Sequence, residues 1–144
     1  MTTPALSKAD LALIETASDA IRRRYRYDWQ EVGAAIRLRS GKVFTGVSLD
    51  AYLGRMAICA EAVALGQAIT NSGETAIDTV VAVRHPPPEE KSRPITVVSP
   101  CGACRELIWD YDRNARVIVP GNAGPEAVAI ADLIPNKYSR ERGN

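Results

Sequence analysis

The sequence predicts an α/β fold in which helices cover a single mixed β-sheet. The first observation is the order of the expected elements: helix, two strands, helix, two strands, helix and strand. The second is the turn-forming pair Ser40-Gly41 between two apolar runs, which indicates an antiparallel hairpin. Strands joined through helices run parallel, so the hairpin and the helical connections together give a mixed sheet.

The length and composition fit an ordinary globular protein. The 144 residues fit one domain, expected over residues 1–144, and the 46% hydrophobic and 24% charged residues argue against disorder or coiled coil. A formal net charge of +1 gives no electrostatic reason to expect nucleic acid or a membrane surface as partner. Without a signal-peptide pattern or a membrane-length apolar run, the expected location is cytoplasmic.

The first expected helix runs from about Ser7 to Arg24. Ser7 followed three residues later by Asp10 is typical of a capped helix start. Apolar residues then recur at helical spacing: Leu13, Ile14, Ala17, Ala20 and Ile21. The two strands of the hairpin are expected over Val32–Leu38 and Val43–Leu49.

The alanine-rich segment Cys59–Ile69 predicts a second helix, which begins near Cys59 and ends at Asn71–Gly73. Short β-branched runs predict three more strands, over Thr79–Val83, Ile95–Val98 and Val117–Val119. The first two of these runs could instead form one long interrupted strand. The proline-rich stretch between them, His85–Pro94, is interpreted as an exposed loop.

A third helix is expected over Gly102–Asp112, directly after Pro100. Its start carries Cys101 and Cys104, and the third cysteine of the chain, Cys59, stands at the expected start of the second helix. An odd number of cysteines argues against a secreted disulfide scaffold. Three thiolates from two helix starts could instead bind zinc and leave a fourth tetrahedral position open for catalysis.

The separate motifs have simpler interpretations. Cys-x-x-Cys could be a redox pair, Cys59 a small buried hydrophobe, and Glu61 an acid favoured by the helix dipole. The combination is more specific, because Glu61 stands two positions after Cys59 and Pro100 directly precedes Cys101. A ligand-x-Glu segment followed by Pro-Cys-x-x-Cys is the signature of zinc deaminases, in which the glutamate is a general acid and base.

On these motifs the sequence resembles the cytidine deaminase family, in particular its small three-cysteine branch. The segments that follow the order of the family are Val32 to Ala35, Phe44 to Gly46, Cys59 to Glu61, Ser99 to Arg105 and Leu133 to Pro135. The resemblance implies a three-layer α/β/α sandwich around a five-stranded mixed sheet. It also implies a homo-oligomer, a tetramer or possibly a dimer, whose active sites take residues from neighbouring subunits.

The same resemblance implies the roles of individual residues. One Zn²⁺ per subunit is expected on Cys59, Cys101 and Cys104, with Glu61 as the catalytic residue. Backbone groups of Ala60 and Ser99 are expected to contact the edge of the base.

The substrate side departs from the family, in which Asn and Glu hold the ribose. Ser48 and Asp50 stand at those positions, and their shorter side chains pull the polar atoms back. Gln30 replaces an aromatic residue that usually lies against the base, although Tyr27 matches the family. Tyr27 and the adjacent Trp29 could equally pack the first helix on the sheet.

The sequence also departs from the family in the residues that offset the negative charge of the zinc site. Many three-cysteine members place an arginine after the glutamate or between the paired cysteines, where this chain has Ala62 and Ala103. Arg55 is the predicted alternative, as a residue that contacts substrate or tunes the zinc, although an exposed arginine is the more common outcome. Arg105 is a further candidate for the compensating charge.

Three functions remain in competition at this point. The first is zinc-dependent deamination of cytidine or deoxycytidine to uridine or deoxyuridine, with release of ammonia. The second is the same reaction on an elaborated cytosine nucleoside such as blasticidin S, or on another amino-heterocycle. The third is a non-catalytic zinc-stabilised binding domain, which an acid beside an open zinc position argues against.

Overall fold

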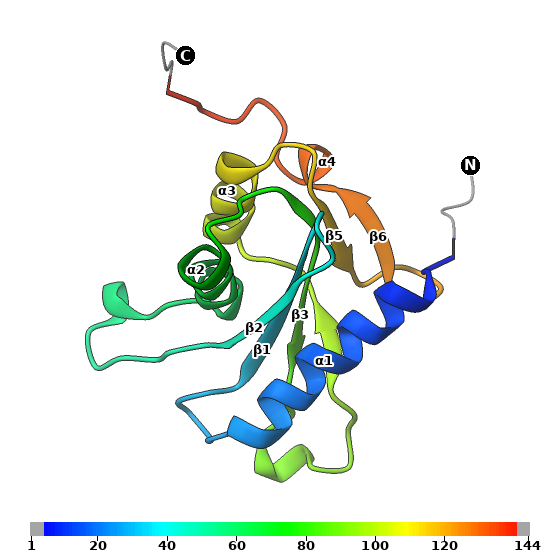
Figure 1. Cartoon of the computed structure of the whole chain (residues 1–144). Coiled ribbons are helices and arrows are strands. Elements are labelled where there is room, and N and C mark those ends of the chain that lie inside the picture. The colour runs from blue at the N-terminus through cyan, green and yellow to red at the C-terminus, as the bar shows by residue number, and fades with distance from the viewer. Residues whose placement is uncertain (1–4, 141–144) are drawn as a thin grey trace.

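The computed structural model describes residues 5–140 and places a mixed β-sheet between helices on its two faces (Figure 1). The elements in chain order are α1 (Lys8–Arg24), β1 (Val32–Leu38), β2 (Val43–Val47), the 3-10 helix η1 (Gly54–Met56), α2 (Ala60–Ser72), β3 (Ile77–Arg84), the 3-10 helix η2 (Pro88–Glu90), β4 (Thr96–Val98), α3 (Gly102–Tyr111), β5 (Arg116–Val119), β6 (Glu126–Ala129) and α4 (Ile130–Leu133).

The sheet has the strand order β2-β1-β3-β5-β6, with β4 paired to β3 outside this path. The β3–β5 pair is parallel and the other pairs are antiparallel, which confirms the mixed sheet. Residues 79–81 of β3 pair with β5, and residues 82–84 pair with β4. The runs on either side of the proline loop are therefore two strands rather than one interrupted strand.

The described residues form six strands, one more than the five expected. The additional strand is β6, whose sequence Glu-Ala-Val-Ala contains residues that are poor strand formers by themselves. It forms because all four residues pair with β5, from Arg116↔Ala129 to Val119↔Glu126. Pairing across the sheet overrides the weak local preference.

The three predicted helices are confirmed with ends shifted by at most a few residues. The Ser7 Oγ accepts a hydrogen bond of 3.0 Å from the Asp10 amide, and the Asp10 carboxylate accepts one of 3.3 Å from the Ser7 amide. This capping box satisfies two amides at the start of α1. Gly73 ends α2 in the left-handed conformation, with φ of 72°.

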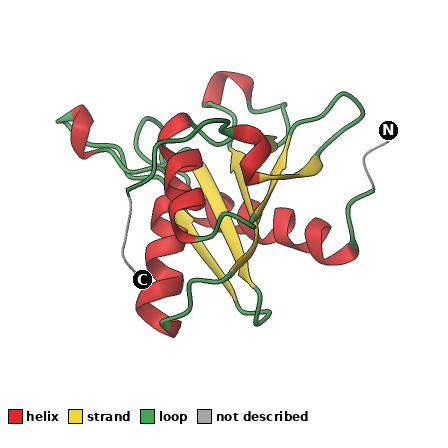
Figure 2. Ribbon diagram, turned by 90° about the horizontal axis from the view of Figure 1, so that it is seen from above, coloured by secondary structure: helices red, strands yellow, loops and turns green. Residues whose placement is uncertain are grey.

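Helices cover both faces of the sheet, as the view from above also shows (Figure 2). On one face α1 packs Leu13, Ala17 and Ile21 against strand residues that include Ala35 and Val81. On the other face α2, α3 and α4 pack against the alternate strand residues. These are Ala34, Ile36, Leu38, Val80, Ala82 and Val117.

Two glycines allow helices to approach the sheet closely. A Cβ atom on Gly33 would lie 2.7 Å from the carbonyl oxygen of Ala17 in α1, and one on Gly46 would lie 2.5 Å from the amide of Ala64 in α2. Neither position has room for a side chain. Gly46 therefore fixes the distance between β2 and the helix whose first turn carries the predicted catalytic glutamate.

The segment between β2 and α2 projects from the body of the molecule (Figure 1). A bridge between Leu49 and Ile58 closes its base, and η1 forms its tip. Within the described part of the chain, no helix is long and apolar enough to cross a membrane.

Candidate active site

The three cysteines meet at the N-termini of two helices. Cys59 is the N-cap residue of α2, Cys101 is the N-cap residue of α3, and Cys104 lies in the first turn of α3. Their sulfur atoms all lie within 4.8 Å of one another, and the sulfurs of Cys59 and Cys101 are 3.4 Å apart. The amide of Cys104 donates a hydrogen bond of 3.4 Å to the sulfur of Cys101. The two helix starts therefore converge on one cluster of sulfurs.

The chemistry and spacing of the cluster fit zinc. Thiolates bound to tetrahedral zinc at about 2.3 Å lie about 3.8 Å from one another, a separation close to that observed. Within the described residues, no other histidine, cysteine or acidic side chain joins the group. Three protein ligands leave one tetrahedral position for water, as in a catalytic zinc site.

The electrostatics of the free thiols also favour a cation. Burial raises the pKa of Cys59 and of Cys104, and nearby Glu61 raises both further. At Cys101 burial acts in the same direction, but hydrogen bonds from the Cys104 amide and from the thiols of Cys59 and Cys104 together outweigh it and lower the pKa. A bound divalent cation would stabilise all three thiolates and offset most of their negative charge.

Glu61 lies in the first turn of α2 and only 7% of its surface is exposed. Burial raises its pKa, and hydrogen bonds from its own backbone amide and from Cys104 only partly oppose the shift. A carboxyl group with a raised pKa is suited to take up and return a proton near neutral pH.

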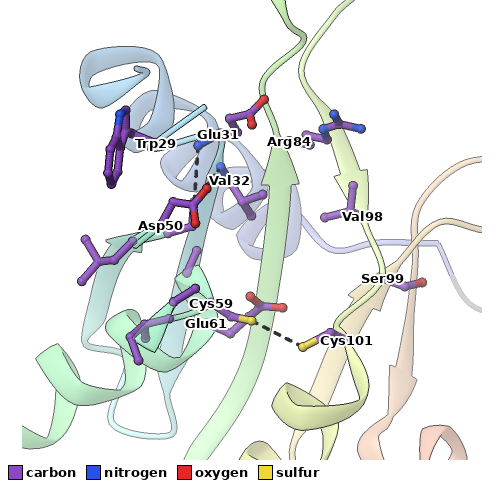
Figure 3. A pocket seen from close by; sticks show the side chains of 15 residues that line it. Trp29, Glu31, Val32, Asp50, Cys59, Glu61, Arg84, Val98, Ser99 and Cys101 are labelled. Carbon is purple, nitrogen blue, oxygen red and sulfur yellow. Dashed lines mark hydrogen bonds between the residues drawn. The ribbon is translucent and has the colours of Figure 1, made fainter. Parts of the chain in front are cut away.

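Cys59, Cys101 and Glu61 lie at one end of a pocket of about 360 Å³ (Figure 3). This volume suits a small molecule. Ala60 and Ser99, which adjoin the cysteines in the chain or stand close before them, line the pocket, and so do apolar residues: Val32, Leu49, Ala57, Ile58 and Val98. Trp29, Glu31 and Arg84 line the end away from the sulfurs (Figure 3).

Ser48 and Asp50 also line the pocket, but both polar side chains have local partners. The Ser48 Oγ accepts hydrogen bonds from the amides of Glu31, at 3.3 Å, and Val32, at 3.2 Å. The Asp50 Oδ1 accepts one of 2.8 Å from the amide of Ala51. The hydroxyl of Ser48 therefore holds the start of β1, at the position where the family carries a ribose ligand.

Two predicted substrate-binding residues lie apart from the pocket in the described chain. Tyr27 is 52% exposed in the turn before β1, and Arg55 is exposed in η1 at the tip of the projecting segment. Neither residue lines the pocket. Their roles stay predictions. Trp29 does line the pocket, and its ring meets that of Tyr52 edge-on, with centroids 5.2 Å apart.

Arg105 does not reach the sulfurs. Its Nε donates to the carbonyl of Pro100 at 2.9 Å, and its Nη1 donates to the carbonyl of Leu133 at 3.0 Å. The side chain thus joins the residue before Cys101 to the end of α4. We interpret Arg105 as a residue that positions the loop of the cysteine cluster.

Sequence reasoning missed Glu31 and Arg84. Glu31 directly precedes β1 and Arg84 ends β3, and the register of the two strands pairs Val32 with Arg84. A charged residue at the end of an apolar run is common, so neither position stood out in the sequence. The only available signal was the antiparallel pairing, which spacing along the chain does not contain.

Three thiols with an open fourth position and a buried carboxyl group beside them can activate water and transfer its proton. On a mixed sheet between layers of helices, this arrangement defines the class of zinc-dependent hydrolytic deaminases.

The comparisons with known proteins agree with this class. Residues 7–120 match the family described as "Cytidine and deoxycytidylate deaminase zinc-binding region". The chain is 46% identical over 135 residues to Blasticidin-S deaminase of Bacillus cereus, over 94% of this chain and 96% of that protein. It is 30% identical over 115 residues to a "Probable cytidine deaminase" of Dictyostelium discoideum, over 80% of this chain and 73% of that protein.

A solved structure extends the likeness to the fold. The cytidine deaminase from Burkholderia pseudomallei matches with a TM-score of 0.71 and 25% identity, over 92% of this chain and 100% of that one. The protein therefore belongs to the cytidine and deoxycytidylate deaminase family. The predicted family, the α/β fold, the zinc cofactor and the hydrolytic deaminase activity are confirmed.

Proposed function

We propose that Cys59, Cys101 and Cys104 hold the zinc and that Glu61 is the general acid and base of the deamination. The observation that carries this proposal is the buried carboxyl group of Glu61 beside the sulfur cluster at one end of the pocket. When bound, the zinc would lower the pKa of a water molecule, so that a nucleophile is available near neutral pH.

Glu61 then moves the protons of the reaction. Its carboxylate takes a proton from the attacking water and delivers it to the ring nitrogen next to the carbon under attack. It later takes the remaining hydroxyl proton and delivers it to the amino group, which leaves as ammonia while a carbonyl remains. Backbone groups of Ala60 and Ser99, which line the same part of the pocket, are suited to hold the edge of the base.

We propose an elaborated cytosine nucleoside of the blasticidin S type as the preferred substrate. Two observations support this choice. The relative named Blasticidin-S deaminase aligns with nearly the whole chain at 46% identity. In addition, the Ser48 hydroxyl already accepts from two backbone amides, so only its own proton remains for a hydrogen bond to a ribose. Cytidine or deoxycytidine is the second candidate, supported by the relatives named cytidine deaminase.

A substrate panel tests both candidates. The zinc-loaded protein is incubated with cytidine, deoxycytidine, cytosine, blasticidin S and several aminopurines, and ammonia release and ultraviolet absorbance are followed. We expect the highest kcat/KM with blasticidin S. Faster turnover of cytidine would favour the second candidate, and no ammonia from any compound would favour the non-catalytic zinc domain.

We also propose that the protein is a homo-oligomer, with a tetramer expected. The projecting segment supports an interface with a second copy, because its side chains Tyr52, Leu53 and Met56 are 95%, 63% and 59% exposed. Light scattering coupled to gel filtration should give about four times the mass of the chain. A monomer at micromolar concentration would contradict the proposal.

A cytoplasmic location is the remaining proposal. Three clustered thiols that are to bind zinc must stay reduced, which a reducing compartment ensures. Cell fractionation with antibody detection tests the location, and recovery in the secreted or membrane fraction would contradict it.

A further inference from the structure

The end of the pocket away from the sulfurs carries two side chains of opposite charge, Glu31 and Arg84 (Figure 3). They stand at the paired ends of β1 and β3. Within residues 5–140, no hydrogen bond or ion pair engages the Glu31 carboxylate or the Arg84 guanidinium, and the two groups do not pair with each other. Both charges are thus available to a molecule in the pocket.

The backbone that carries these charges is held on both sides. The Ser48 Oγ accepts from the amides of Glu31 and Val32, and the Ser48 amide donates to the carbonyl of Val32 at 2.9 Å. The amide of His85, which follows Arg84, donates to the carbonyl of Glu31 at 2.8 Å. Positions fixed before binding reduce the entropy lost when a ligand is bound.

Glu31 and Arg84 lie at the opposite end of the pocket from the proposed site of deamination (Figure 3), and this position determines which part of a substrate they can contact. A base placed with its amino-bearing carbon at the sulfurs and Glu61 leaves the opposite end of the pocket, which Glu31 and Arg84 line (Figure 3), for the sugar and its substituents. A neutral ribose can form hydrogen bonds with either side chain, but it carries no charge that would balance those of Glu31 and Arg84. A substituent that carries both charges could form a charge-assisted hydrogen bond with each residue.

The charges that line the pocket favour a carboxylate over a phosphate as the anionic group of the substrate. Asp50 lines the same pocket, so two carboxylates in addition to Glu61 accompany the single guanidinium of Arg84. A phosphate carries between one and two negative charges at neutral pH and would be repelled by both carboxylates. A carboxylate together with a cationic group matches this arrangement better.

We infer that Glu31 and Arg84 form a specificity subsite for cytosine nucleosides whose sugar portion carries both a carboxylate and a cationic amine or guanidine. Arg84 donates hydrogen bonds to the carboxylate, and Glu31 accepts them from the cation. This inference rests on the proposed function, because it places the base at the cysteine cluster, and it assigns the substrate class of the same site.

The test compares variants on substrates that lack one charge at a time. The substrates are blasticidin S, its carboxylate methyl ester, an analogue with a neutral acyl group in place of the aminoacyl arm, and deoxycytidine with and without a 5′-phosphate. Arg84→Gln should lower kcat/KM for blasticidin S about tenfold, mainly through KM. The loss should be much smaller on the methyl ester, which has no carboxylate.

Glu31→Gln should show the reciprocal pattern, with a loss of about tenfold on blasticidin S and a much smaller loss on the neutral-arm analogue. Glu15→Gln and Arg23→Gln are matched controls, because they make the same charge changes on α1, outside the pocket. Neither control should alter the ratios between substrates.

Equal losses of kcat/KM on all substrates in both variants would contradict the subsite. It would also be contradicted if a 5′-phosphate raised kcat/KM for deoxycytidine and this gain required Arg84. Calorimetric binding of blasticidin S to the zinc-loaded protein separates this failure from that of the proposed function. Binding that requires Arg84 without any turnover would support the subsite and contradict the proposed deamination. Absence of both binding and turnover would contradict both.

Discussion

The Asp10 carboxylate at the start of α1 accepts a hydrogen bond of 2.8 Å from the Arg37 guanidinium on β1. Asp10 is 1% exposed, and its second oxygen accepts a bond of 3.1 Å from Arg116 on β5. Arg37 also donates to Asp78 on β3 at 2.7 Å. The network thus joins the first helix to three strands of the sheet, so its ionisation affects the stability of the whole fold.

The stability should therefore fall in acid. Burial alone would raise the pKa of Asp10, but the hydrogen bonds from Arg37 and Arg116 outweigh it and lower the pKa from 3.8 to about 2. A lowered pKa in the folded state stabilises the protein at any pH above the unfolded value, here by about 2 kcal/mol. This contribution is lost as the pH falls from about 4 to about 2. Urea denaturation at several pH values measures it, and a free energy of unfolding that stays constant over this interval would contradict the network.

The substitution Asp10→Asn tests the same network at neutral pH. It keeps the size of the side chain but leaves the charges of Arg37 and Arg116 without their shared partner, and we expect a loss of about 2 to 4 kcal/mol in the free energy of unfolding. Asp19→Asn is the matched control on the exposed side of α1, where the ion pair with Arg22 is half exposed and should contribute at most about 1 kcal/mol. Similar losses in the two variants would show that burial of Asp10 has no special effect.

Local signals predicted the helices because their ends are determined by neighbouring residues. The Ser7 and Asp10 pair and Gly73 act over one turn of chain, and the structure contains both devices. Strand β6 was missed because it depends on pairing with β5, which the alanine-rich sequence does not indicate. Elements with a clear local pattern, including the β-branched runs of β3 to β5, were predictable, whereas β6 has no such pattern and depends on its pairing.

The same division applies to the site. The convergence of the three cysteines at two helix starts could be predicted, because the spacing of a zinc-deaminase signature stands in the sequence itself. Glu31 and Arg84 lie more than fifty positions apart and meet only through the β1–β3 register. Arg55 was selected for its position before the second helix, but the projecting segment directs that stretch away from the pocket of its own chain.

The contact between β2 and α2 predicts opposite effects of alanine at two glycines. Gly46→Ala places a methyl group where the Ala64 amide lies 2.5 Å away, so the free energy of unfolding should fall by about 1 to 3 kcal/mol and the zinc affinity with it. Gly66 lies in α2, and a Cβ atom added there would have no atom from outside the neighbouring turns of the helix within 4 Å. Gly66→Ala should therefore stabilise the protein by up to about 1 kcal/mol. Thermal denaturation and a metal titration measure both effects. A stabilising Gly46→Ala would contradict the close approach of helix and sheet.

Removal of zinc should destabilise the fold at the two helix starts. A ligand that binds only the folded state adds RT ln(1 + [L]/Kd) to its stability, about 4 kcal/mol at a free concentration a thousand times Kd. Chelation should therefore lower Tm markedly in the unchanged protein. Cys104→Ser, which removes a buried thiol from the proposed zinc site, should make Tm nearly insensitive to the chelator. An equal response of both proteins would show that the metal stabilises the fold elsewhere.

The final prediction separates metal binding from proton transfer at Glu61. Glu61→Gln keeps the size of the buried side chain and removes its ability to take up and return a proton, so kcat should fall by at least about a hundredfold. The zinc content should remain one per chain, because the three sulfurs that form the cluster are unchanged. Loss of a nearby negative charge should also lower the pKa of Cys59 and Cys104, both of which Glu61 raises. Zinc affinity at acidic pH should consequently stay equal or increase. A Glu61→Gln protein that loses its zinc would show that the carboxylate supports the metal site, and one that keeps its turnover would exclude Glu61 as the acid and base.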